Sequence, residues 1–262
     1  MSKSNLIEKK KSRCSSYKKN EDPELIEWIQ LILKERPTYG YRRITALLNS
    51  KRKEQGKVTV NHKRIYRIMK LHHLLLRKAN KRPERTHRGK VETLLSNTRW
   101  CSDGFTIQCF NGDRVWVAFS MDTCDREVMR YISSTIGIDG QAIRDLMLET
   151  VEYRFGIPKS AYSVQWLSDN GSCYTAKETV AFGRQLGLDI RTTPTYSPES
   201  NGMAEAFVKT FKRDYVWFGD LKDAKTVMSQ LPQWFEDYNE KAPHKALKML
   251  SPREFLRLKL AS

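Results

Sequence analysis

Apolar residues recur at helical spacing in the first part of the chain and predict three short helices. Their approximate ranges are 22–36, 40–49 and 61–73. Asp22 followed by Pro23 is typical of a helix start, and a polar break at residues 50–57 separates the second helix from the third. Three short helices with a basic last one favour a helix-turn-helix module, whose final helix enters the major groove of DNA. The pattern alone also allows a small helical bundle with a solvated, charged face.

The pattern changes after residue 98, where strand-like runs begin. Strands are predicted at 99–107, 114–122, 128–135, 163–167 and 188–192. Helices are predicted at 140–155 and 176–186, and another begins near Gly202. Three strands in a row, followed by alternating helix and strand, describe a mixed sheet covered by helices, so the fold class is α/β.

Positive charge is concentrated in the first third of the chain. The formal net charge is +17, and residues 1–98 hold 26 Lys and Arg against 9 Asp and Glu, whereas residues 99–262 hold 21 of each. Such an excess attracts a polyanion, because each neutralised phosphate releases condensed counterions. Nucleic acid is therefore the leading partner.

Several classes of protein are disfavoured by composition. No run of 18 apolar residues exists, so no membrane span is expected, and the basic, polar start shows no secretory signal. The five cysteines are odd in number and never form C-x-x-C, which argues against a disulfide scaffold and a structural zinc site. These features fit a reducing cytoplasm.

Three acidic residues are candidates for chemistry. Asp103 interrupts a predicted strand, Asp169 follows another strand, and Glu205 lies on the helix that begins near Gly202. Each has an ordinary alternative: an edge-strand or turn position for Asp103, an Asp-Asn-Gly turn for Asp169, and a surface ion-pair face for Glu205.

The combination of the three acids is what departs from chance. All lie in one predicted sheet domain, and 35 residues separate Asp169 from Glu205. Converging carboxylates repel one another unless divalent cations are present, and Mg²⁺ prefers oxygen ligands. Two such ions stabilise the attacking and leaving oxygens of an in-line phosphoryl displacement. In this scheme Asp103 bridges the two ions, while Asp169 and Glu205 each bind one.

Basic side chains near these features are candidate DNA contacts. Lys209 and Lys212 follow Glu205 on the same helix and are expected to hold DNA phosphates near the cut. In the helical region the expected contacts are Arg42, Arg43, Lys63, Arg64, Arg67 and Lys70.

Four other polar and aromatic residues are weaker candidates for a role at the site. Asp122 and Asp125 end a strand, and a surface turn is the favoured interpretation. Trp100 and Tyr196 are weaker candidates for stacking on an unpaired base.

The Asp, Asp, 35-residue gap and Glu arrangement resembles the catalytic core of retroviral integrases and insertion-sequence transposases, whose fold resembles ribonuclease H. The stretches that carry the resemblance are Leu167-Ser-Asp-Asn-Gly-Ser172, Ser197-Pro-Glu-Ser-Asn-Gly-Met-Ala-Glu205 with Lys212 seven residues on, and the tail Tyr238-Asn239, Pro243-His244 and Ser251-Pro-Arg-Glu-Phe255. The similarity covers roughly residues 37–258 and is greatest to the second-frame (OrfB) transposase of a bacterial insertion-sequence family.

This resemblance implies a DDE transposase that hydrolyses the 3′ end of its element and then joins the freed 3′-hydroxyl to another phosphodiester. It implies two Mg²⁺ ions, for which Mn²⁺ can substitute, held by Asp103, Asp169 and Glu205. The implied partners are double-stranded DNA at the element ends and target, further copies of the chain on DNA, and an upstream-frame product by fusion or association. The implied location is the bacterial cytoplasm, at the nucleoid.

Charge and hydrophobic patterning, together with the resemblance, set the domain expectations. The predicted parts are a disordered basic tail (1–20), a helix-turn-helix-like DNA-binding domain (21–76), a basic linker (77–97), a ribonuclease H-like catalytic core (98–218) and a helical C-terminal extension (219–262). Many relatives carry Thr two residues after the first Asp, where this chain has Phe105. The zinc module of retroviral integrases is not reproduced, so no zinc is expected.

The sequence also allows two alternatives from other classes. One is a structure-specific nuclease with the same fold and no joining step. The other is a non-catalytic DNA binder in which residues 20–75 carry the function.

Overall fold

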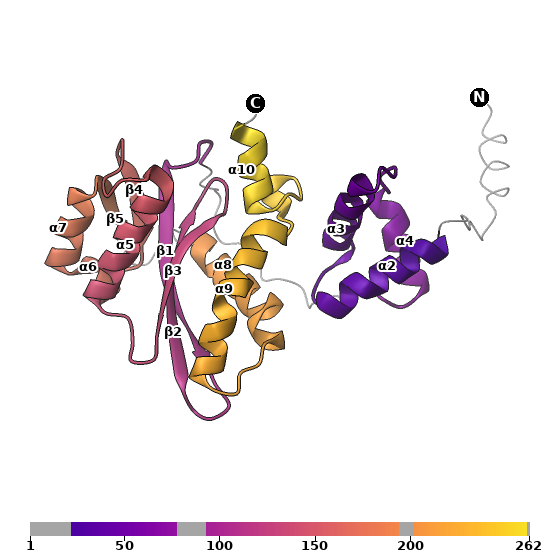
Figure 1. Ribbon diagram of the computed structural model, residues 1–262, viewed down its shortest axis with the longest axis horizontal. Helices are drawn as coiled ribbons and strands as arrows, with labels where there is room; N and C mark the ends of the chain where they lie inside the picture. Colours follow the sequence, from indigo (N-terminus) through magenta and orange to yellow (C-terminus); the bar gives the residue numbers. More distant parts are fainter. Residues whose placement is uncertain (1–21, 78–92, 194–201, 261–262) are drawn as a thin grey trace, which may run out of the picture. The chain divides into compact units, whose positions relative to one another are not determined.

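Figure 1 shows the computed structural model, which describes residues 22–77, 93–193 and 202–260. The chain divides into two compact units, residues 1–78 and 79–262, and each is described by itself. The basic tail predicted at 1–20 and most of the linker predicted at 77–97 lie outside the described residues.

The first unit contains the three predicted helices. They are α2 (Asp22–Glu35), α3 (Tyr41–Glu54) and α4 (His62–Leu71). Their apolar stripes meet in one core that contains Leu25, Ile29, Ile44, Leu48, Ile65 and Met69. The side chain of Asn61 caps α4 by accepting a hydrogen bond from the backbone N–H of Lys63.

One boundary in this unit is predicted wrongly. The break expected at residues 50–57 is helical as far as Glu54, because lysine and arginine are good helix formers without an apolar stripe. Arg52 in this turn is buried, and its Nε donates a hydrogen bond of 2.8 Å to the carbonyl of Val58.

The second unit is built on the predicted mixed sheet, which has five strands within the described residues. They are β1 (Arg99–Gln108), β2 (Arg114–Asp122), β3 (Val128–Ser134), β4 (Val164–Ser168) and β5 (Leu188–Thr192). Their order is β3-β2-β1-β4-β5; β1, β2 and β3 pair antiparallel, whereas β4 pairs parallel with both β1 and β5.

Helices cover both faces of this sheet (Figure 1). One face carries α5 (Gly140–Phe155), α6 (Ser172–Thr175) and α7 (Lys177–Gln185); the other carries α8 (Gly202–Asp214) and α9 (Ala224–Lys241). The single helix predicted at 176–186 is α7, which starts one residue later, and α6 precedes it as a separate turn. The extended backbone of Ala176 (φ −54°, ψ 135°) separates the two.

The residues after position 218 share the core of the sheet. Rings from α9 pack against rings from α8, with centroid distances of 4.6 Å for Phe211–Phe235 and 4.9 Å for Phe207–Tyr238. Phe207 in turn packs on Phe119 of β2 at 4.4 Å. The helix α9 is therefore a layer of this unit, and no break in packing separates it from the strands.

The turn between β2 and β3 is buried, so the prediction of a surface turn for Asp122 and Asp125 is wrong. Both residues are 0% exposed. Asp122 accepts hydrogen bonds from the backbone N–H groups of Asn97 and Cys124, and Asp125 pairs with Arg154. Burial first, and then the neighbouring Asp122, raises the pKa of Asp125 to about 6.

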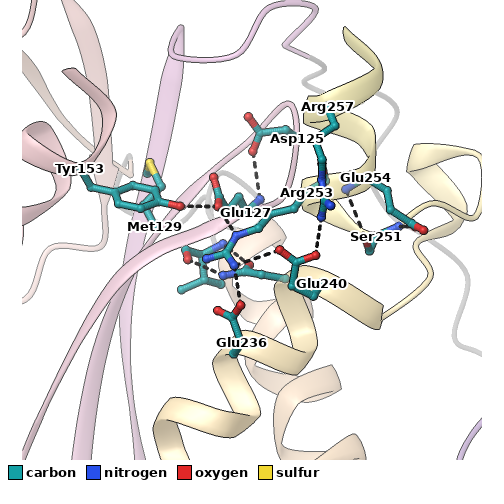
Figure 2. A network of polar contacts seen from close by, with 12 residues as sticks. Asp125, Glu127, Met129, Tyr153, Glu236, Glu240, Ser251, Arg253, Glu254 and Arg257 are labelled. Carbon is teal, nitrogen blue, oxygen red and sulfur yellow. Dashed lines mark hydrogen bonds and ion pairs between the residues drawn. The ribbon is translucent and has the colours of Figure 1, made fainter. Parts of the chain in front are cut away.

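A polar network fastens the C-terminal helix α10 (Pro252–Leu260) to this turn (Figure 2). Glu127 accepts hydrogen bonds from the Tyr153 hydroxyl at 2.7 Å and from Arg253 Nε at 2.8 Å. Arg253 Nη1 also bonds to Glu236 and Glu240 of α9. The tail motif of the sequence thus holds the C-terminal helices in place.

No helix in the part of the chain that the structure describes is long and apolar enough to cross a membrane.

Candidate active site

Asp103 lies in the middle of β1 on the face that α8 covers. Its neighbours on that face, Cys101 and Phe105, are buried in the core shared with α8 and α9, whereas Asp103 is only partly buried. Its Oδ1 accepts a hydrogen bond of 2.8 Å from the backbone N–H of Gly104. A charged group therefore interrupts an otherwise apolar row.

Asp169 follows the last residue of β4 and is exposed. Its Oδ1 accepts a hydrogen bond of 3.1 Å from the N–H of Gly171, and a Cβ at position 171 would lie 3.0 Å from the same oxygen. The parallel pairing aligns Cys101 with Leu167. Asp103 and Asp169 each lie two residues beyond this last aligned pair.

Glu205 lies in the first turn of α8 and is exposed. The opposite side of α8 is buried, and Phe211 packs on Phe105 of β1 with centroids 5.7 Å apart. Lys209 is exposed, while Lys212 Nζ lies over the Phe105 ring at 5.6 Å from its centroid. The side chain that replaces the Thr of many relatives is thus a packing group that contacts a candidate DNA-binding lysine.

The three acids interact electrostatically. Burial raises the pKa of Asp103 to about 6, the charges of Asp169 and Glu205 add to this, and the Gly104 N–H partly offsets it. Among the described residues, however, no three His, Cys, Asp or Glu side chains lie close enough to hold a metal ion together. The structure gathers the three acids into one region without bringing them to ligating distance.

The chemistry of the donors fits a hard divalent cation. The three groups are carboxylates, and a positive ion would offset the burial and the carboxylate repulsion that raise the pKa of Asp103. They come from a strand, a strand end and a helix terminus.

The cations of the first unit fall into two groups. Arg42, Lys63 and Lys70 are exposed. Arg64 and Arg67 instead pair with Asp22 of α2, at 2.7 Å and 3.0 Å, and the Arg64 side chain is only 14% exposed. Of the expected DNA contacts on α4, the two lysines project to solvent and the two arginines have partners within the unit.

Arg43, the remaining predicted contact, stacks over Tyr39, with its guanidinium carbon 3.5 Å from the ring centroid. Tyr66 of α4, which is not among the predicted contacts, is 42% exposed and packs edge-on against Tyr41 at 5.1 Å. In the sequence, Tyr66 is marked as a large aromatic residue on the polar side of a basic helix.

The prediction that Trp100 stacks on an unpaired base is wrong. Trp100 is 0% exposed and packs against Trp166 and Phe155 beneath α5. As the second residue of β1 it points to the face opposite Asp103, and its Nε1–H donates a hydrogen bond of 3.3 Å to the side chain of Asn97. Tyr196, the other stacking candidate, lies outside the described residues.

Comparisons with known proteins agree with this architecture. An HTH-like domain model matches residues 19–82, and two integrase core domain models match residues 95–198 and 186–252. The chain is 46% identical over 239 residues to "Transposase InsD for insertion element IS2A/D/F/H/I/K" of Escherichia coli, covering 90% of this chain and 79% of that protein. The InsD transposase for insertion element IS2-9 of strain K12 matches equally well, with 78% of its length covered.

Solved structures give the same fold at low sequence identity. A chain in the cryoEM structure of the simian T-cell lymphotropic virus intasome in complex with PP2A regulatory subunit B56 gamma matches with a TM-score of 0.53 and 17% identity. The match covers 87% of this chain and 73% of that chain, and it shows a likeness of fold alone.

Proposed function

Because this chain belongs to the insertion-element transposases with an integrase core domain, we propose that Asp103, Asp169 and Glu205 are its catalytic, metal-binding carboxylates. Transposases with this core are polynucleotidyl transferases of the DDE type. The observation that carries the residue assignment is the placement of the three acids: Asp103 is in the middle of β1 on the face that α8 covers, Asp169 follows the neighbouring strand β4, and Glu205 is in the first turn of α8.

The ions best suited to these ligands are two Mg²⁺, with Mn²⁺ as a substitute. Bound there, they would supply Lewis-acid stabilisation of the attacking and leaving oxygens of an in-line displacement. Because the three groups are apart in the structure, we infer that ion and DNA binding together draw Glu205 toward the two aspartates.

Two lysines of α8 have the role of binding DNA next to the metal site. Lys209 and Lys212 lie one and two helical turns after Glu205 and bind DNA phosphates beside the scissile bond. Phe105 packs against Lys212 and helps to fix the position of its ammonium group. The same residues serve hydrolysis at the 3′ end of the element and the later attack by the freed 3′-hydroxyl.

The first unit positions the element ends. Lys63 and Lys70 of α4, with Arg42 of α3, are the exposed cations of the predicted set and contact duplex DNA. Arg64 and Arg67 contact DNA only if their ion pairs with Asp22 break. We propose further that the active form is a homo-oligomer on DNA, alone or joined to the product of an upstream frame.

A strand-transfer assay tests this function. The purified chain is incubated with Mg²⁺, a duplex bearing one end of its own element, and a target plasmid. We expect both cleaved and joined products, and a simple nuclease would give cleaved products alone. Glu205→Gln should abolish both reactions and leave DNA binding unchanged. The matched control Glu152→Gln, which alters an exposed glutamate of α5, should keep both reactions.

A further inference from the structure

Two buried hydroxyl groups lie directly behind the candidate carboxylates. Ser102, which precedes Asp103, is 0% exposed, and Tyr174 of α6 is 4% exposed. Their side-chain oxygens share a hydrogen bond of 2.9 Å between groups 72 residues apart in the chain. Burial is the main cause of a raised pKa of Tyr174, so its hydroxyl stays protonated.

This bond lies where the backbone no longer holds the two strands together. The pairing of β1 with β4 covers Arg99–Cys101 and Gln165–Leu167, and it stops two residues before Asp103 and Asp169. Beyond that point, the Ser102–Tyr174 bond connects the acid-bearing part of β1 to the segment that follows Asp169.

On the other side of the bond, Tyr174 is tied to Asp169 through one residue. The backbone N–H of Tyr174 donates to the carbonyl of Gly171 at 3.0 Å, and the N–H of Gly171 donates to the Asp169 carboxylate at 3.1 Å. A Cβ at position 171 would also lie 3.5 Å from the Tyr174 ring. Any shift of Tyr174 is therefore passed to the turn that orients Asp169.

We propose that Ser102 and Tyr174 are positioning residues that set the separation of the Asp103 and Asp169 carboxylates for metal binding. The inference rests on the proposed function of those two aspartates. Outer groups that orient the ligands of a metal typically change its affinity by about 10–100-fold when they are removed. The hydroxyl pair has this role without touching metal or DNA.

The test compares two phenylalanine variants that each remove one part-buried or buried tyrosine hydroxyl. Tyr174→Phe breaks the bond to Ser102, and Tyr153→Phe breaks the bond to Glu127 in the C-terminal network. Mn²⁺ binding to the full chain is titrated by the loss of the free-ion EPR signal, and the half-saturating Mg²⁺ concentration for cleavage is measured separately from the maximal rate.

We expect Tyr174→Phe to weaken Mn²⁺ binding by about tenfold and to raise the half-saturating Mg²⁺ concentration by a similar factor. Tyr153→Phe should leave both values unchanged even where it lowers the melting temperature. Ser102→Ala should also weaken Mn²⁺ binding, and the double variant should lose less than the sum of the two single losses, because the two hydroxyl groups share one hydrogen bond.

Equal Mn²⁺ binding by the wild-type chain and Tyr174→Phe would overturn the positioning role and leave the proposed function intact. Additive losses in the double variant would also overturn it, since the residues would then act separately. A wild-type chain that, together with an element-end duplex, binds no more Mn²⁺ than the duplex alone would refute both this inference and the metal-dependent function.

Discussion

The substitution Asp103→Asn should stabilise the protein when no divalent metal is present. Asp103 is charged at neutral pH in a partly buried position, and Asp169 and Glu205 add repulsion. The asparagine side chain has the same shape, and its oxygen can still accept the hydrogen bond from Gly104. The substitution therefore removes the unfavourable charge with little loss of packing.

The size of the effect follows from the pKa of Asp103, which rises from 3.8 to about 6 on folding. At about 1.4 kcal/mol per unit this shift corresponds to about 3 kcal/mol, and solvent screening of a partly exposed group reduces it to about 1–2 kcal/mol. Because the folded-state pKa is raised, the penalty is absent below pH 3.8, grows between pH 3.8 and about 6, and is complete above.

Urea denaturation with EDTA at pH 7.5 and pH 4 measures this difference. Asp103→Asn should gain about 1–2 kcal/mol at pH 7.5 and almost nothing at pH 4. The control Asp145→Asn, at an exposed position on α5, should change neither value. A loss of stability in Asp103→Asn at pH 7.5, or a gain that is the same at both pH values, would refute the electrostatic reasoning.

Three further predictions follow from the same structure. Protons compete with metal for Asp103, so the half-saturating Mg²⁺ concentration for cleavage should rise by up to about tenfold per unit as the pH falls below about 6; a flat profile between pH 5 and 7 would contradict this. Arg154→Met leaves buried carboxylates short of a partner and should cost about 3–5 kcal/mol in urea denaturation, whereas Arg191→Met, at an exposed ion pair, should cost less than about 1 kcal/mol; equal costs would show that burial of the pair is unimportant. The affinity for duplex DNA falls as salt rises, and Lys63→Gln should make the plot of log affinity against log salt less steep by about 1 without changing stability. Arg64→Met should mainly lower the melting temperature, and the reverse pattern would show that Arg64 leaves Asp22 to bind DNA.

Features set by local sequence were predictable. The five strands follow from short apolar runs, and α2, α3 and α4 follow from helical spacing with Asp22-Pro23 at the start. The family was also readable, because the Leu-Ser-Asp-Asn-Gly-Ser stretch and the 35-residue gap before Glu205 are specific. The end of α3 was missed because charged residues alone carry no apolar period.

Features that depend on distant parts of the chain were not predictable. The segment Asp122-Thr-Cys-Asp125 has the composition of a surface turn and does form a turn, but both aspartates are buried. The residues that follow it are bonded to Asn239 and Arg253, which lie more than 100 positions later in the chain. The pairing of Arg64 with Asp22 spans 42 residues, and no local pattern marks it. The position of Glu205 relative to the two aspartates likewise depends on packing between α8 and β1.

Metal binding by the three acids is tested most directly by a crystal structure of the chain with Mn²⁺ and a duplex of its element end, with diffraction data that record the anomalous scattering of manganese. We expect anomalous peaks bound by carboxylate oxygens of Asp103, Asp169 and Glu205, with Glu205 drawn toward the two aspartates. Well-ordered Mn²⁺ bound by other residues, or bound by the aspartates with Glu205 still pointing to solvent, would contradict it.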